Sequence, residues 1–358
     1  MTFALVYALF GFVAARLSVP GRRKPLLVAA MAVWSLATIA QGAAIGFASM
    51  LVGRLVVGIG EAAVVPASHA MIADAYPAQR RASAMALFQT GANIGLLLAF
   101  VIGGAVAATW GWRAAFIVAG APGLVLAVIL LVWLPEPGDT AAPDERATRP
   151  GLRLAFGLVW GQTSARCALL GSVLSSLVSF GGVAWVPTYL AREHTMTLQQ
   201  VGLYLAVLVG VIGALGTWLG GALSDRAEAR SPGGRMRVVV ASVVIAKLGA
   251  VVFYLLGPSP LALIVFVIPV AVNGVFVAPA MSHVYGHLPA RQRPMASAIL
   301  MFGANFVGLG LGPITVGVMS DLFQGLVEQP LGLALGILQV FGFWAAWMFW
   351  RAGKTQTP

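Results

Sequence analysis

YPAQRRASAMALFQTGANIG, at residues 76–95, returns as LPARQRPMASAILMFGANFV at residues 288–307. At a constant offset, which pairs Arg81 with Arg293 and Asn93 with Asn305, the two stretches share Pro, Arg and Asn as well as Ala and Gly. Chance agreement in a chain rich in Ala and Gly does not explain the shared Pro, Arg and Asn. We therefore predict a tandem duplication, and parallel repeats in a membrane protein form two helical bundles with a binding site at their interface.

The composition excludes a soluble globular protein. Of 358 residues, 59% are hydrophobic and only 9% are charged, and the mean hydropathy is +0.92, whereas soluble domains carry about 25% charged residues. The net charge of +11 does not indicate a nucleic-acid partner, because Lys and Arg lie in short connections between long apolar runs. The single cysteine, Cys167, lies in an apolar run and therefore predicts a packing role rather than a disulfide or a metal site.

Eleven apolar runs lie between turn signals and approach the length of about 20 residues that a membrane span requires. The predicted spans cover residues 2–18, 26–47, 50–73, 82–108, 112–134, 167–190, 199–223, 237–257, 260–285, 295–320 and 330–350. The first run lacks a basic leader and a small-residue cleavage site, so we expect a retained span rather than a signal peptide.

Basic residues mark alternate connections between these spans. They lie within residues 16–24, 80–81, 146–166, 226–237, 291–293 and 351–354. The other connections contain only Arg113 and Arg192. By the positive-inside rule the first set is cytoplasmic, so residue 1 is expected outside and the C-terminus inside the cell. We expect a multi-pass protein of the cell inner (plasma) membrane.

The repeat also predicts the division into domains. Four predicted spans precede Pro289 in the second half, but only three precede the corresponding Pro77. We therefore expect an N-terminal helical bundle of five spans at residues 1–134, a polar cytoplasmic linker at 135–165 and a C-terminal bundle of six spans at 166–358. Two halves of six spans would give twelve, so we expect the first helix of the first half to be absent. One alternative is that the chain is a truncated relic that does not transport.

Several motifs carry a resemblance to a known family. They are RLVVGIGEAAVVPASHAMIADAYPAQRRASAMAL at 54–87, TWGWRAAF at 109–116, WVPTYL at 185–190, GALSDR at 221–226 and GPITVGVMSD at 312–321. With them the chain resembles the major facilitator superfamily, in particular its bacterial spinster-like members, over nearly its whole length. The resemblance implies an all-α membrane protein with two helical bundles of the major facilitator fold. Related organic-anion symporters share several of these strings, and that subgroup stays open.

The resemblance also implies a cytoplasmic gating motif, Gly-x-Leu-Ala-Asp-Arg, in each half. Gly221, Asp225 and Arg226 match it in the second half, whereas Val19 and Pro20 replace the Asp and the Arg in the first half. An Asp within reach of a helix N-terminus and an Arg can latch two bundles together. We therefore expect a weakened latch in the first half. Alternatively, these charges only set the topology.

Three further charged residues complete the predicted gating motif. Asp74 directly follows the third predicted span, and Arg81 and Arg293 are the arginines that the repeat shares.

Two ionisable residues, Arg54 and Glu61, lie inside the third predicted span. A charged group at mid-bilayer costs roughly 2.5 to 3.5 kcal/mol on insertion scales, so it indicates function unless its side chain reaches the membrane interface. Arg54, near the outer face, is able to reach it, whereas Glu61, near the middle, is not. With Gly58 and Ser68 they fall on one helical stripe, predicted to line the central cavity. A helical rise of about 10 Å over seven residues prevents a direct salt bridge between them. We expect Glu61 to carry protons; alternatively it is a neutral packing residue.

Other polar residues inside the spans complete the predicted cavity. They are His69, Asn93, Trp185, Lys247, Asn273 and Asn305. His69 is a candidate proton relay or a structural hydrogen-bonding residue. Lys247 either attracts an anionic substrate, pairs with an acid or reaches the lipid edge. The asparagines bind substrate or bridge helices, and Trp185 lines the cavity mouth or the membrane interface.

These features together predict a secondary active transporter that works by alternating access and is coupled to protons. The sequence contains no P-loop, nucleotide fingerprint or catalytic cluster, so we expect no cofactor, no metal and no enzymatic activity. The expected partners are a small anionic or amphipathic organic solute, protons and the lipid bilayer. The protein is expected to act as a monomer.

Overall fold

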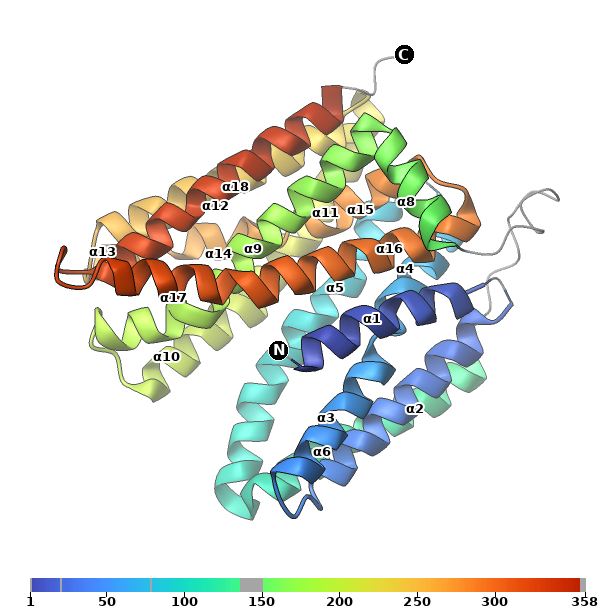
Figure 1. Ribbon diagram of the computed structural model, residues 1–358, viewed down its shortest axis with the longest axis horizontal. Coiled ribbons are helices and arrows are strands. Elements are labelled where there is room, and N and C mark those ends of the chain that lie inside the picture. Colours follow the sequence, from blue (N-terminus) through green and yellow to red (C-terminus); the bar gives the residue numbers. More distant parts are fainter. Residues whose placement is uncertain (1, 20, 78, 136–150, 355–358) are drawn as a thin grey trace. The chain divides into compact units, whose positions relative to one another are not determined.

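The computed structural model describes residues 2–19, 21–77, 79–135 and 151–354. Within these residues the chain forms helices and no strand (Figure 1). A bilayer offers no water to backbone N–H and C=O groups, so a chain this apolar satisfies them inside helices. Residues 136–150, about half of the predicted linker, lie outside the described residues.

The chain divides into two compact units. Unit 1 contains residues 1–77, 98–159 and 287–302, and unit 2 contains residues 78–97, 160–286 and 303–358. Each unit therefore includes a segment from the other half of the sequence. The predicted division at residues 134 and 166 stays a prediction.

Unit 1 is built around α2. Its helical segments are α1 (Thr2–Leu17), α2 (Arg23–Gln41), α3 (Phe47–Glu61), α4 (Val64–Ala75), η1 (Ala99–Gly103), α6 (Gly104–Trp133), most of α8 (Leu152–Gly161), η3 (Ala290–Gln292) and nearly all of α16 (Arg293–Gly303). Helix α2 packs along α6 on one side and along α3 on another, while α1 packs on α3.

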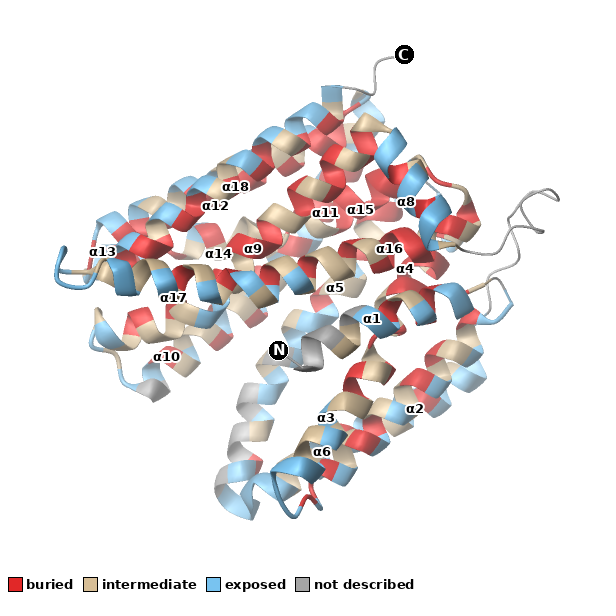
Figure 2. Ribbon diagram, viewed as in Figure 1, coloured by how far each residue is buried: buried red, intermediate tan, exposed pale blue. Residues whose placement is uncertain are grey.

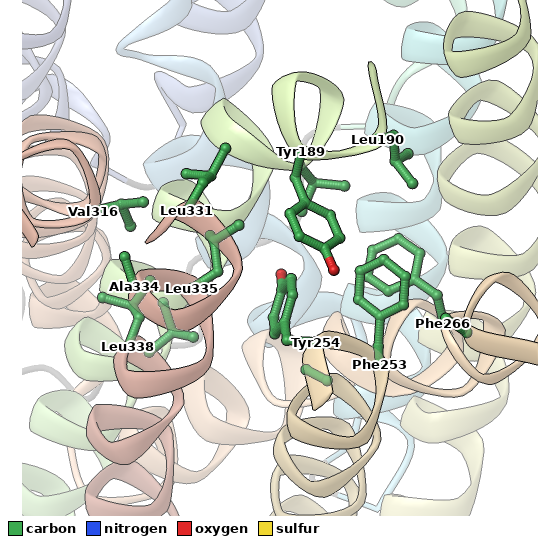
Figure 3. Close-up of a cluster of buried hydrophobic side chains, with 14 of the residues drawn as sticks. Tyr189, Leu190, Phe253, Tyr254, Phe266, Val316, Leu331, Ala334, Leu335 and Leu338 are labelled. Atoms are coloured by element: carbon green, nitrogen blue, oxygen red, sulfur yellow. The ribbon is translucent and has the colours of Figure 1, made fainter. Parts of the chain in front are cut away.

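Unit 2 contains the larger apolar core. Its helical segments are α5 (Arg81–Leu98), α9 (Thr163–Arg192), α10 (Leu198–Leu205), η2 (Ala206–Ile212), α11 (Gly213–Arg230), α12 (Gly234–Leu255), α13 (Pro260–Val265), α14 (Val267–Asn273), α15 (Val277–Gly286), η4 (Ala304–Leu311), α17 (Gly312–Leu322) and α18 (Pro330–Lys354). Helix α18 packs on α9 and α12. Tyr189, Phe253, Tyr254 and Leu335 interlock there (Figure 3), and the Phe253 and Phe266 ring centroids lie 4.3 Å apart.

A break inside α6 separates two of the predicted spans. Gly111 has a φ of +83°, a left-handed conformation that side chains with a Cβ rarely adopt. The predicted spans end at residue 108 and begin again at 112, so the turn falls where the sequence places it.

Nine helices in the described part of the chain are long and apolar enough to cross a membrane. The two remaining predicted spans, 2–18 and 82–108, correspond to α1, which has 16 residues, and to α5 with η1. The count of eleven spans is therefore not confirmed and stays a prediction. Many residues of these helices are exposed (Figure 2). Large apolar side chains are among them; Trp133 and Leu255 are each 80% exposed. Lipid contact explains such exposure.

Candidate functional site

Glu61 lies where one membrane-length helix is interrupted. Helix α3 ends at Glu61 and α4 begins at Val64, although Ala62 and Ala63 keep right-handed helical dihedrals. Pro66 explains the interruption, because it has no N–H to donate to the carbonyl four residues earlier. The Glu61 side chain is half-buried, and none of the described residues forms an ion pair with it. A carboxyl at such a break can exchange a proton without disrupting a salt bridge.

Arg54 lies on the same helix and is exposed. Its guanidinium carbon lies 5.6 Å from the centroid of the Phe116 ring, which is a cation–π contact within unit 1. Among the described residues no salt bridge joins Arg54 to Glu61, as the helical rise predicts.

Lys247 is the charged centre of a polar cluster in unit 2. The side chain is 4% exposed, and its Nζ donates a hydrogen bond of 3.2 Å to Oδ1 of Asn273. Asn273 in turn donates 3.1 Å from Nδ2 to Oγ of Ser179. Lys247 therefore does not lie at the lipid edge, which removes one of the alternatives. Neither Asn273 nor Ser179 offers a negative charge to balance the ammonium group.

The repeat relates this cluster to Glu61. The offset that pairs Arg81 with Arg293 also pairs Glu61 with Asn273. Both residues end a segment that precedes a break in a membrane-length helix, since α3 ends at Glu61 before α4 and α14 ends at Asn273 before α15. The signal for this relation is present in the sequence as the constant offset between the repeats.

Asp225 occupies the N-terminus of α5. Its carboxylate accepts hydrogen bonds from the backbone N–H of Ala82 at 3.3 Å and of Ser83 at 2.7 Å, and from Oγ of Ser83 at 2.7 Å. Nη2 of Arg235 lies 3.1 Å from Oδ1 on the other side. Backbone N–H groups in the first turn of a helix have no acceptor within the helix, and together with the helix dipole they favour an anion at this position.

Among the described residues, the ion-pair partner of Asp225 is Arg235 and not the neighbouring motif residue Arg226. Arg226 is exposed, whereas Arg235 is buried and binds Asp225. Adjacent residues of a helix point in different directions, so Asp225 and Arg226 cannot share one face. The buried Arg81 precedes the N–H groups that bind Asp225.

Gly221 allows α5 and α11 to approach closely enough for this contact. A Cβ at Gly221 would overlap the Cβ of Ala86 and lie 3.0 Å from the carbonyl oxygen of Ala82. We expect Gly221→Val to lower the unfolding free energy by about 1 to 3 kcal/mol, since overpacking separates the helices. Thermal unfolding in detergent measures the change. Gly91→Val on α5, where a Cβ meets open space, is the matched control; equal melting of the two variants would contradict the prediction.

Asp74 lies between two arginines in unit 1. Arg23 binds Oδ2, and Nη1 of Arg293 lies 2.7 Å from Oδ1. The Asp74 and Arg23 side chains are each 1% exposed, and the Arg293 side chain is 16% exposed. The sequence placed Asp74 in the motif but did not identify Arg23 as its partner.

Two of the remaining predicted residues, His69 and Trp185, bridge helices. Nδ1 of His69 lies 3.3 Å from Oγ of Ser297, and the ring is buried, which fits a structural histidine. Nε1 of Trp185 donates 2.8 Å to the carbonyl oxygen of Pro313. Ser68, Asn93 and Asn305 are half-buried. The structure brings Lys247 together with Asn273 but joins none of these other residues to them.

Membrane-length helices that bury charged clusters define a polytopic membrane transport protein. The chain belongs to the Major Facilitator Superfamily, which it matches over residues 1–313. Members of this family are transporters and not enzymes.

The similar proteins are transporters as well. The chain is 29% identical to an MFS-type efflux pump of Mycolicibacterium smegmatis, covering 94% of this chain and 78% of that protein. It is 29% identical to the 3-(3-hydroxy-phenyl)propionate transporter of Escherichia coli, covering 88% and 77%. Among solved structures, an inward-facing bacterial homologue of the human lysosomal transporter Spinster aligns with a TM-score of 0.69 and 24% identity, covering 99% and 88%. This last likeness shows the fold.

Proposed function

We propose that this protein transports a small organic anion, hydrophilic or amphipathic, across the cell inner membrane by alternating access and in a proton-coupled manner. The observation that carries the substrate class is the buried Lys247. Its ammonium group is held by the neutral side chain of Asn273 and has no acidic partner among the described residues. A carboxylate substrate would supply the missing negative charge.

The proton-coupling part of the proposal rests on Glu61. An ionisable group inside a membrane span is retained for a purpose, because it costs free energy to insert. Glu61 occupies the place in the first repeat that Asn273, which accepts the hydrogen bond from Lys247, occupies in the second. We infer that the first half handles the proton while the second half attracts the anion.

Two cytoplasmic clusters serve as gates in this proposal. Asp225 joins α11 to the start of α5, and Asp74 joins α4 to the start of α16. Helices from both halves of the sequence meet in each cluster, so alternating access requires these ion pairs to open and close. The protein is proposed to work as a monomer.

The relatives support an organic anion as the substrate. The Escherichia coli relative is named for 3-(3-hydroxy-phenyl)propionate, a carboxylate with an aromatic ring. This compound and its uncharged primary amide therefore form a matched pair of probes, and sugar acids with their neutral sugars form a second pair.

The test compares Lys247→Met with the unaltered protein in proteoliposomes. We expect the unaltered protein to transport at least one carboxylate but not its neutral analogue. Lys247→Met is expected to raise the KM of that carboxylate about 10- to 100-fold, because a hydrogen bond to a charged group contributes about 1.5 to 3 kcal/mol. Lys354→Met, which removes an exposed lysine, is the control. Equal transport of acids and amides would overturn the proposed substrate class.

A further inference from the structure

A cavity of about 890 Å³ opens in unit 1 beside α1, α8 and the start of α16. Its volume lies within the range of about 300 to 1,000 Å³ that is typical of ligand pockets. None of the residues predicted for transport or gating lines it. The proposed transport and gating residues therefore do not account for this cavity.

Helix α8 forms one wall and cannot cross a membrane, because it has ten residues. Ala155 packs on Ala15 and Met295, and the N–H of Gly151 donates 3.3 Å to Oε1 of Gln292. Leu152, Leu154 and Phe156 nevertheless stay 45 to 46% exposed. A short helix with exposed apolar residues, fixed beside membrane spans, lies in the membrane interface.

Two arginines line the cavity. Arg16 belongs to the last turn of α1, and Arg153 belongs to the first turn of α8. No acidic side chain among the described residues pairs with either of them. Both residues lie in connections that the positive-inside rule places in the cytoplasm. The cavity therefore favours an anionic group at the cytoplasmic boundary of the bilayer.

The remaining walls are apolar. Phe12 and Val13 come from α1, Leu154 and Leu158 come from α8, and Met295 comes from α16. A hydrophilic anion would leave these walls against water, whereas a molecule with a phosphate and a hydrocarbon chain would match both parts. We propose that the cavity binds one anionic phospholipid of the cytoplasmic leaflet, with its phosphate on Arg16 and Arg153 and an acyl chain along the apolar walls.

Native mass spectrometry of the full-length protein tests this proposal with phosphatidylglycerol and phosphatidylcholine as probes. The unaltered protein is expected to retain one phosphatidylglycerol in preference to phosphatidylcholine. The double variant Arg16→Gln/Arg153→Gln is expected to lose that preference by at least about tenfold, because two charge-assisted contacts disappear. Arg80→Gln/Arg230→Gln removes two exposed charges from the same side of the membrane and is the matched control.

Three outcomes would overturn the proposal. The first is an equal loss of preference in the control, which would indicate a general effect of net charge. The second is an unchanged preference in Arg16→Gln/Arg153→Gln. The third is thermal stabilisation by glycerol phosphate or inorganic phosphate alone as large as that by phosphatidylglycerol, which would indicate a site for a soluble anion.

Discussion

The variant Glu61→Gln is expected to abolish proton-driven accumulation of the substrate. With one proton coupled to each anion, a pH difference of one unit corresponds to about 1.4 kcal/mol and sustains about tenfold accumulation. The variant is expected to equilibrate the substrate without accumulating it. Counterflow of labelled against unlabelled substrate should persist, because glutamine keeps the size and polarity of the side chain.

The structure explains why this single change should suffice. Glu61 is half-buried at the end of α3, inside the candidate span Phe47–Ala75, and no described residue forms an ion pair with it. The charge on this group can therefore change without leaving an arginine or lysine unpaired. Asp74, the other acid of the same span, is held by two arginines and is poorly suited to exchange a proton.

The measurement uses proteoliposomes with an internal pH indicator and a labelled substrate. Glu328→Gln removes an exposed carboxyl and is the matched control, expected to accumulate substrate as the unaltered protein does. Accumulation by Glu61→Gln at the level of this control would exclude Glu61 from coupling. Loss of both accumulation and counterflow would indicate a structural role instead.

Asp74→Asn is expected to produce the largest loss of stability. Removing one partner of a buried ion pair costs about 3 to 5 kcal/mol, because the remaining charge keeps its desolvation penalty. Here the carboxylate serves both Arg23 and Arg293, and the Asp74 side chain is 1% exposed. Thermal unfolding in detergent, followed by tryptophan fluorescence, measures the effect.

Two further variants test the cause of that loss. Asp321→Asn changes an exposed carboxyl and should leave the melting temperature nearly unchanged. Asp74→Asn/Arg293→Gln removes one of the two cations and should recover part of the lost stability, because fewer charges are then left unpaired. If Asp74→Asn unfolds at the temperature of Asp321→Asn, the cluster does not stabilise the protein.

The elements of the fold follow from local patterns that are visible in the chain. Apolar runs between turn signals predicted helices, and nine of those in the described residues have the length and hydropathy of membrane spans. Gly111 lies between two predicted spans, and its positive φ places a turn there. Such features depend on residues that are close together in the sequence, so they can be predicted from the sequence alone.

The partners of the charged residues could not be predicted from such local patterns. Arg226 is next to Asp225 in the sequence, but the buried Arg235 binds the carboxylate. Asp74 pairs with Arg23, far from it along the chain. The sequence alone allowed Lys247 to reach the lipid edge, but its side chain is buried and donates a hydrogen bond to Asn273. Each pairing depends on which helix packs beside which, and hydropathy carries no information on that.

The sequence by itself determined that this protein is a duplicated, membrane-embedded helical transporter with ionisable residues inside its spans. It could do so because the cost of placing polar groups in lipid acts on every residue of a span and leaves a strong pattern. Only the tertiary structure decided which charges meet, and that the Arg16 and Arg153 side chains line one cavity. The physical reason is that ion pairs and cavities form across helix contacts, where a few ångströms between side chains decide the interaction.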